Sequence, residues 1–128
     1  VDVNLNALYH VTRAVLPGMV ERGRGHVVIV GSIAGRSAFV GGTCYAATKH
    51  AVMGFAESLL FEVRDRGVKV SVVNPGSVDT FLSPKKEGAD TSWKLTAGDV
   101  AECIAQVVST PPNVLQFQVE VRALKKGG

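Results

Sequence analysis

A phenol and an ammonium group stand four positions apart in the segment Tyr45-x-x-x-Lys49. On a helix, this spacing places the two side chains one above the other on the same face. The unperturbed pKa of tyrosine is about 10, so the phenol is almost entirely neutral at pH 7 and is a poor base. A cation held close to it favours the phenolate and lowers that pKa towards neutrality. The pair is therefore a candidate for general acid–base chemistry, with an ordinary surface pair as the alternative.

A third candidate, Ser32, stands upstream of this pair in a loop bounded by glycines. A hydroxyl brought beside the phenol can hydrogen-bond a substrate oxygen and stabilise the negative charge that develops on it. Serine is also a normal turn residue, so capping of the loop is the alternative role for Ser32. The elements around these residues decide between the two interpretations.

Hydrophobic periodicity predicts six elements that alternate between helix and strand. The helices show apolar residues at helical spacing, and the strands show short β-branched or alternating runs bounded by turn residues. A capping-box sequence, Thr96-Ala-Gly-Asp99, opens the last helix. We expect helices at about 5–20, 44–66 and 96–109, and strands at 26–30, 68–73 and 114–121.

This alternation is typical of an α/β fold, in which a parallel sheet carries helices on its faces. The β-branched runs at 26–30 and 68–73 indicate strands that are buried on both faces. Ligands of such sheets bind at the carboxyl ends of the strands. The segments Gly31-Ser32 and Asn74-Pro75-Gly76 both follow strands, so we expect them to meet the start of the Tyr45 helix at that edge.

Composition narrows the class of protein. The 128 residues suffice for a single domain, 1–128, and 46% hydrophobic residues with 20% charged residues are typical of a globular chain. No apolar run approaches the roughly 20 residues that span a bilayer, and no secretory signal opens the chain, so we expect no membrane partner. The net charge is only +3 and most cations are scattered along the sequence, which argues against binding of nucleic acid.

Metal binding and disulfide formation are not indicated by the sequence. The cysteines Cys44 and Cys103 have no metal-ligand spacing and suggest no disulfide framework, which favours a cytoplasmic location. The three histidines, at positions 10, 26 and 50, have no mutual spacing that suggests a metal site. We therefore predict a site without a metal ion.

Four short motifs stand in order along the chain: Asn4 in the first helix, Ser32 after the first strand, the pair Tyr45 and Lys49, and the segment from Pro75 to Thr80. Together they resemble the C-terminal half of a short-chain dehydrogenase/reductase, over essentially the whole chain. Each motif is modest alone, but four in register are highly specific. The resemblance implies a Rossmann-like, doubly wound parallel sheet.

The resemblance also implies a catalytic role for each of four residues. Tyr45 would be the general acid in carbonyl reduction and the general base in alcohol oxidation. Lys49 would lower the pKa of Tyr45 and hold the ribose hydroxyls of the nicotinamide nucleotide. Ser32 would bind the substrate oxygen together with Tyr45. Asn4 would hold a water molecule that connects Lys49 to solvent, with an ordinary helix N-terminal role as its alternative.

The implied cofactor is NAD or NADP, and the implied substrate is a small carbonyl compound or secondary alcohol. The hydride moves between the cofactor and the substrate carbon, and the protein orients both. By resemblance, the cofactor contacts come from Tyr45, Lys49, Pro75, Gly76, Val78 and Thr80. For Pro75 and Gly76, simple termination of the strand is the alternative role.

The chain departs from the family pattern on its N-terminal side. It contains no glycine-rich turn that follows a strand and opens a helix towards a pyrophosphate. The βαβ units that bind the dinucleotide, and the residue that separates NAD from NADP, are missing with that turn. We therefore expect that Val1 is not the natural start, and that the 128 residues alone bind dinucleotide weakly and are inactive.

Two other functions remain open. The first is a non-catalytic scaffold, because small residues on the helix at 44–66 suit close packing with another subunit. The same feature predicts a homodimer or homotetramer formed through helices 2–22 and 44–66. The second is an epimerase or dehydratase that uses the same tyrosine–lysine pair with tightly held NAD.

Overall fold

The computed structural model describes residues 2–31, 41–76, 78–79 and 90–125, and of residues 2–5, 41–46, 48, 78 and 79 it describes the backbone alone. The elements are α1 (Asp2–Arg22), β1 (Gly25–Val30), α2 (Gly41–Val63), the 3₁₀ helix η1 (Arg64–Arg66), β2 (Val68–Pro75), β3 (Val78–Asp79), β4 (Leu95–Thr96), α3 (Ala97–Val108) and β5 (Gln118–Val121). The predicted alternation of helix and strand is confirmed.

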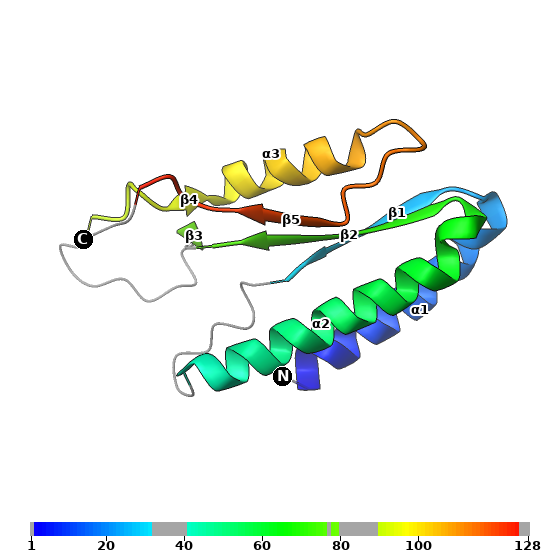
Figure 1. Cartoon of the computed structure of the whole chain (residues 1–128), viewed down its shortest axis with the longest axis horizontal. Coiled ribbons are helices and arrows are strands. Elements are labelled where there is room, and N and C mark those ends of the chain that lie inside the picture. The colour runs from blue at the N-terminus through cyan, green and yellow to red at the C-terminus, as the bar shows by residue number, and fades with distance from the viewer. Residues whose placement is uncertain (1, 32–40, 77, 80–89, 126–128) are drawn as a thin grey trace.

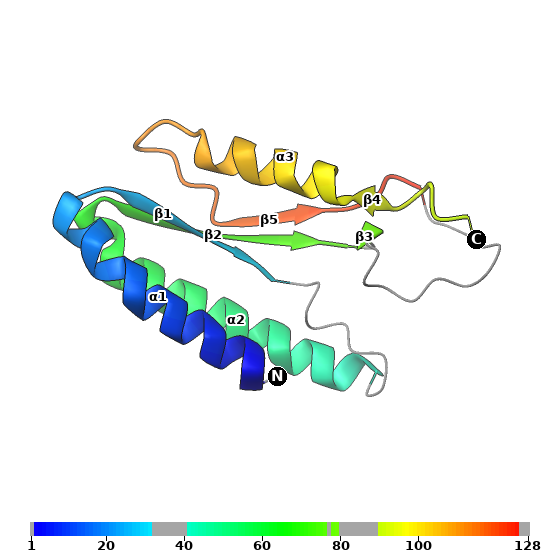
Figure 2. The same ribbon diagram turned by 180° about the vertical axis from the view of Figure 1, so that it is seen from behind.

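Three of the strands form one parallel sheet in the order β1-β2-β5. The register pairs Val30 with Val73 and Pro75 with Val121. Helices α1 and α2 lie side by side on one face of the sheet, and α3 covers the other face (Figure 1, Figure 2). The sheet is therefore doubly wound, as the α/β prediction requires.

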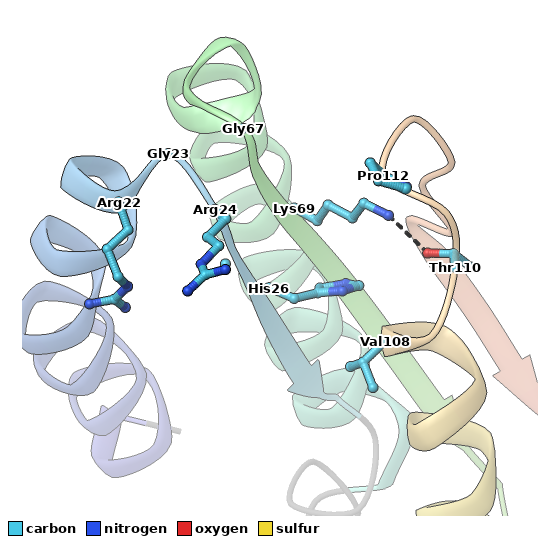
Figure 3. A pocket seen from close by; sticks show the side chains of 10 residues that line it. Arg22, Gly23, Arg24, His26, Gly67, Lys69, Val108, Thr110 and Pro112 are labelled. Atoms are coloured by element: carbon cyan, nitrogen blue, oxygen red, sulfur yellow. Dashed lines mark hydrogen bonds between the residues drawn. The ribbon is translucent and has the colours of Figure 1, made fainter.

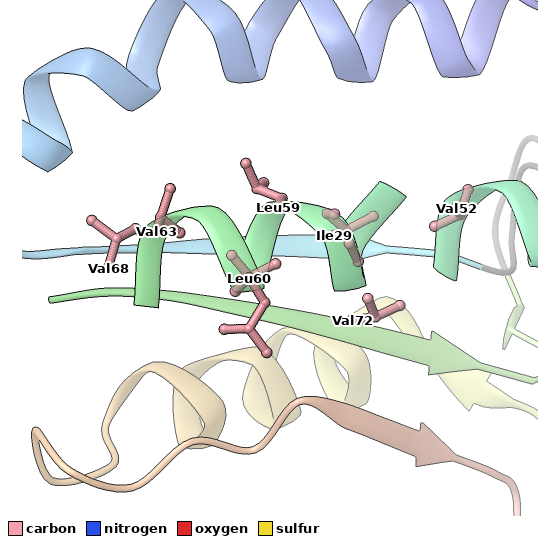
Figure 4. Packing of buried hydrophobic residues seen from close by; sticks show 9 residues of the cluster. Ile29, Val52, Leu59, Leu60, Val63, Val68 and Val72 are labelled. Carbon is pink, nitrogen blue, oxygen red and sulfur yellow. The ribbon is translucent and has the colours of Figure 1, made fainter. Parts of the chain in front are cut away.

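The centre of the core is β2, because it has a strand on each side and helices on both faces. Its valines 68, 70, 72 and 73 are almost completely buried. The apolar face of α2 packs against the valines at 68, 70 and 72 and against Ile29 of β1 (Figure 4). Burial on both faces explains why β2 has a nearly continuous β-branched sequence rather than an alternating one.

Strand β1 is less buried than predicted. Of its six residues only Ile29 is buried, and Val30 is 40% exposed. Within the described sheet β1 pairs with β2 alone. No described strand forms backbone hydrogen bonds with its other edge. A β-branched run fits a strand of a parallel sheet, but it does not reveal which strand lies at the edge.

The boundaries of the other strands also differ from prediction. β2 continues through Asn74 and Pro75, because its donors towards β5 are alternate residues: the N–H of Val72 donates to Phe117 O (2.6 Å) and that of Gly76 to Val121 O (2.9 Å), so the missing N–H of Pro75 interrupts no bond to β5. The last strand begins at Gln118 rather than Val114, because Val114 belongs to a turn in which its N–H donates to Pro111 O. The short parallel pair of β3 and β4 was not predicted, since two residues carry no periodicity.

The predicted capping box is confirmed. The backbone N–H of Asp99 donates to Thr96 Oγ1 (3.0 Å), and that of Thr96 donates to Asp99 Oδ2 (2.9 Å). These bonds satisfy two of the donors that a helix leaves free at its start. Within the described part of the chain, no helix is long and apolar enough to cross a bilayer.

Candidate functional site

The carboxyl ends of β1 and β2 meet at Gly31 and Asn74. Gly31 continues the ladder beyond β1, with its N–H donating to Val73 O at 2.9 Å. A Cβ atom on Gly31 would collide with Asn74 Oδ1 and would lie 3.3 Å from Val72 Cγ1. Only glycine therefore fits here without a shift, and the segment that leads to Ser32 leaves the sheet directly beside the Asn74 carboxamide.

Lys49 lies near the same edge. It is exposed on α2, and it lines a cavity of about 310 Å³ together with Met53, Asn74, Gln118, Val119 and Glu120. The cavity lies between α2, the carboxyl-terminal part of β2 and the first three residues of β5. Strand order and helix packing thus bring an ammonium group and a carboxamide to one wall, although the two are far apart in the sequence.

Glu120 gives this wall a negative charge. The pKa of its carboxyl group is lowered, first by the hydrogen bonds and charge of Arg122 and then by the charge of Lys49. Arg122 Nη2 donates to Glu120 Oε1 at 2.7 Å, and Arg122 Nε donates to the same oxygen at 3.0 Å. Because both side chains of this pair are exposed, solvent screens these interactions strongly.

Pro75 and Gly76 lie at the same edge of the sheet. Pro75 is buried at the end of β2, and the bond from Gly76 to Val121 fixes the point at which the chain leaves the ladder. The prediction that the segments following the first two strands reach one edge is confirmed for Gly31 and for 74–76.

For three of the remaining predicted site residues the structure describes only the backbone, and two others lie outside the described residues. Asn4 lies in α1, and Tyr45 lies in α2 one helical turn before Lys49, so the predicted helix beneath the pair is present. Val78 lies in β3. Ser32 and Thr80 fall outside the described residues.

The sequence places Asn74 at this edge but assigns it no contact with a ligand, and it does not predict Glu120 for the site at all. The position of Asn74, directly after the β-branched run that becomes β2, was the available signal. No sequence signal points to Glu120. Its approach to Lys49 depends on the register between β2 and β5. The local sequence around a strand does not predict which residues of a distant strand it pairs with.

Comparisons with known proteins all identify relatives that are dehydrogenases or oxidoreductases. A family model described as short chain dehydrogenase matches residues 1–91. The NADP-dependent 3-hydroxy acid dehydrogenase YdfG of Salmonella typhimurium is 37% identical over 131 residues, which cover 94% of this chain and 53% of that protein. An uncharacterized oxidoreductase of Staphylococcus aureus is 34% identical over 122 residues, covering 95% of this chain and 52% of its own.

Solved structures agree with these relatives. A serine dehydrogenase from Escherichia coli superposes with a TM-score of 0.69 at 36% identity, covering 91% of this chain and 48% of that one. A closed form of serine dehydrogenase complexed with NADP⁺ gives a TM-score of 0.69 at 33% identity, with 89% of this chain and 50% of that one covered. The chain thus spans about half the length of the curated relatives it matches.

Proposed function

This chain belongs to the short chain dehydrogenase family, and from that premise we propose that it carries the proton-transfer site of an NAD(P)-dependent oxidoreductase. The substrate class is a small carbonyl compound or alcohol. The observation that carries the proposal is the position of Lys49, which lines one cavity with Asn74 at the carboxyl edge of the sheet and lies one turn after Tyr45 on a continuous helix.

The donors at this edge fit a nicotinamide nucleotide. The exposed ammonium of Lys49 offers hydrogen bonds to ribose hydroxyls, and Asn74 adds a carboxamide to the same wall. Pro75 and Gly76, with Tyr45, Val78 and Thr80, complete the proposed contacts. When bound, the nicotinamide supplies or accepts the hydride, and the protein orients it.

In this proposal Tyr45 gives a proton to the substrate oxygen in reduction and takes it back in oxidation. Two charges about 4 Å apart near a protein surface interact by about 4 kcal/mol. That energy corresponds to about three pKa units, roughly the gap between a free phenol and neutral pH. The charge of a lysine one helical turn away is therefore large enough to lower the pKa of a tyrosine into the range needed for acid–base catalysis.

Two further residues support this step. Ser32 would donate a hydrogen bond to the substrate oxygen and stabilise the charge that forms there, which is worth a factor of about 10²–10³ in rate for one such donor. Asn4 would hold a water molecule that returns protons from solvent to Lys49. Both roles come from the family resemblance.

The names of the relatives suggest where an assay should begin. The Salmonella typhimurium protein is named for 3-hydroxy acids and NADP, and the Escherichia coli structure for serine, which is itself a 3-hydroxy acid. We therefore propose to test serine and 3-hydroxybutyrate, each with NADP and with NAD, by following absorbance of the reduced nicotinamide.

The decisive variant is Tyr45→Phe, in the protein expressed from its complete open reading frame. Loss of the acid–base group should lower kcat by a factor of about 10²–10⁴ and leave the circular dichroism spectrum unchanged. Tyr9→Phe is the matched control, because Tyr9 is an exposed tyrosine of α1. Undiminished turnover in Tyr45→Phe would refute the role of Tyr45. If the unmutated protein shows no turnover with either cofactor, the alternative function of a non-catalytic scaffold is favoured.

We also propose that α1 and α2 form the contact between subunits of a homodimer or homotetramer. Large apolar side chains stand exposed on both helices. Val11 is 62% exposed and Val15 is 43% exposed on α1, and Phe61 is 62% exposed on α2. Burial of these half-exposed side chains against a second copy would stabilise the assembly, each by about half of the roughly 1.5–3 kcal/mol that a fully exposed side chain gains.

A further inference from the structure

The fold gathers cations at the end of the sheet opposite to the proposed active site. A cavity of about 590 Å³ opens at the amino ends of β1 and β2, and its lining includes Arg22, Arg24, His26, Lys69 and Thr110 (Figure 3). No aspartate or glutamate is among the described residues that line it. Cations that are scattered along the sequence thus line one cavity.

Two glycine turns shape the floor of this cavity. Gly23, after α1, has a φ of 67°, and Gly67, after η1, has a φ of 78°. A Cβ atom on Gly67 would collide with the carbonyl oxygen of Gly23, so the two turns touch through their backbones. This contact brings the turn that carries Arg22 and Arg24 next to the strand that carries Lys69.

Lys69 is a fixed positive charge in the wall. Its Nζ donates to Thr110 Oγ1 at 2.9 Å, to Pro111 O at 2.7 Å and to Val114 O at 2.5 Å. An ammonium group has three N–H donors, and these three bonds use all of them. Lys69 therefore contributes charge at a constant position rather than direct hydrogen bonds to a ligand.

His26 responds to that charge. Its Nε2 lies 2.7 Å from the hydroxyl of Ser71, which is completely buried. Burial, and then the charge of Lys69, lower the pKa of His26 from 6.5. The imidazole is therefore neutral at pH 7 in the free protein, and an anion placed near it would raise that pKa again.

Arg22 and Arg24 are the cations that remain available. Both are exposed, and they flank the turn at the mouth of the cavity (Figure 3). A guanidinium group remains charged at any physiological pH, and its planar fork matches two oxygens of a phosphate group. Among the described residues that line the cavity there is no phenylalanine, tyrosine or tryptophan for base stacking, so a nucleic-acid strand fits less well than a small anion.

We propose that this cavity binds a phosphate group, either inorganic phosphate or the phosphate monoester of a small metabolite. Arg22 and Arg24 bind the oxygens, and Lys69 supplies the fixed charge behind them. The volume exceeds that of a phosphate ion, and Val108 and Pro112 provide an apolar wall for an organic group. The site lies at the opposite ends of the strands from Lys49, so it does not depend on the proposed function.

The test is calorimetric titration of the protein from its complete open reading frame with sodium phosphate, at constant ionic strength kept with chloride. We expect saturable binding with a Kd of about 1 mM or lower, and a loss of about tenfold in Arg24→Gln, since one charge-assisted hydrogen bond accounts for at least that factor. Arg22→Gln should show a similar loss. Arg64→Gln, which removes an exposed arginine of η1 outside the cavity, should bind like the unmutated protein.

Proton NMR supplies a second readout. Phosphate should raise the pKa of His26, observed through its imidazole C–H resonances, and should leave the chemical shifts of the His10 resonances unchanged. Glycerol 3-phosphate distinguishes the two sources, because tighter binding than inorganic phosphate identifies a monoester site and equal binding identifies a phosphate site. The absence of saturation at about 10 mM phosphate, or an equal loss in Arg64→Gln and Arg24→Gln, would overturn the proposal.

Discussion

Asn74 limits what can stand at position 31, and this contact links the sheet to the segment that carries Ser32. The collision that a Cβ on Gly31 would meet is with a half-buried side chain rather than with a flexible surface group. A substitution at position 31 is therefore expected to disturb the next residue, Ser32, which we propose binds the substrate oxygen.

We expect Gly31→Ala to lower the free energy of unfolding by about 1–3 kcal/mol, because it overpacks a filled site. It should also lower kcat, since the Ser32 segment shifts. Gly31→Ala in an Asn74→Ala background should recover part of the lost stability, because the colliding carboxamide is gone. Urea denaturation of the four proteins in this cycle measures the coupling.

Gly54→Ala is the matched control for that cycle. Gly54 lies within α2, and a Cβ there meets nothing within 4 Å. Alanine should stabilise the helix by up to about 1 kcal/mol at this position. Equal destabilisation by alanine at 31 and at 54 would contradict the packing argument.

His26 makes stability depend on pH in a defined direction. Its pKa in the folded state is lowered from 6.5, so below that value the unfolded chain binds more protons than the folded one. Stability should therefore fall as pH drops from 6.5 towards the folded-state pKa, by at most about 1.4 kcal/mol per pH unit, and His26 should have no effect above about pH 7.5. Urea midpoints in phosphate-free buffers, with His26→Gln as the comparison, measure this slope, and a slope that persists in the variant would assign it to another group.

At the scale of residues, sequence reasoning located those whose partners are close in the chain. The spacing of Tyr45 and Lys49 predicts a shared helix face, and both lie on α2. The approach of Glu120 to Lys49, and of Arg24 to Lys69, depends on which strands are neighbours and in which register. Those facts arise from packing of the whole sheet, so no local pattern reveals them.

At the scale of elements, α3 is the best-predicted part of the fold. Its capping box is a local motif, and both of its hydrogen bonds form as expected. Strand lengths were predicted less well, because they depend on distant partners. Val114 to Phe117 have strand-like sequence, but the turn after α3 and the anchoring of Lys69 keep Val114 out of the ladder.

Thr96→Ala tests the contribution of this cap. The variant loses the oxygen that accepts from the backbone of Asp99, so the free energy of unfolding should fall by about 1 kcal/mol. Thermal denaturation followed by circular dichroism measures the change. Gln106→Ala, at an exposed position near the other end of α3, should change stability by less than about 0.5 kcal/mol. A similar loss in both variants would mean that the cap is not responsible.

At the scale of the whole molecule, the exposed apolar side chains of α1 and α2 predict self-association. Phe61→Lys should shift the protein towards a monomer, because it places a charge in the proposed contact. Sedimentation velocity over a range of concentrations measures this shift. Val114→Lys is the control, since Val114 is 45% exposed but lies in the turn after α3, away from both helices. An unmutated protein that remains monomeric at high concentration would contradict the prediction.

The central position of β2 has a consequence for the folding pathway. The partners His26 and Ser71, across β1 and β2, are 45 positions apart, and so are Lys69 and Val114 on its other side. Neither the β1–β2 ladder nor the β2–β5 ladder joins residues that are close in the sequence. The entropy of closing long loops must therefore be lost before either ladder forms, and folding should be slow. Until then the valine-rich segment 68–73 is exposed to other chains, and Lys69 is its only charge. Before it anchors the turn after α3, this lysine therefore acts as a gatekeeper against aggregation.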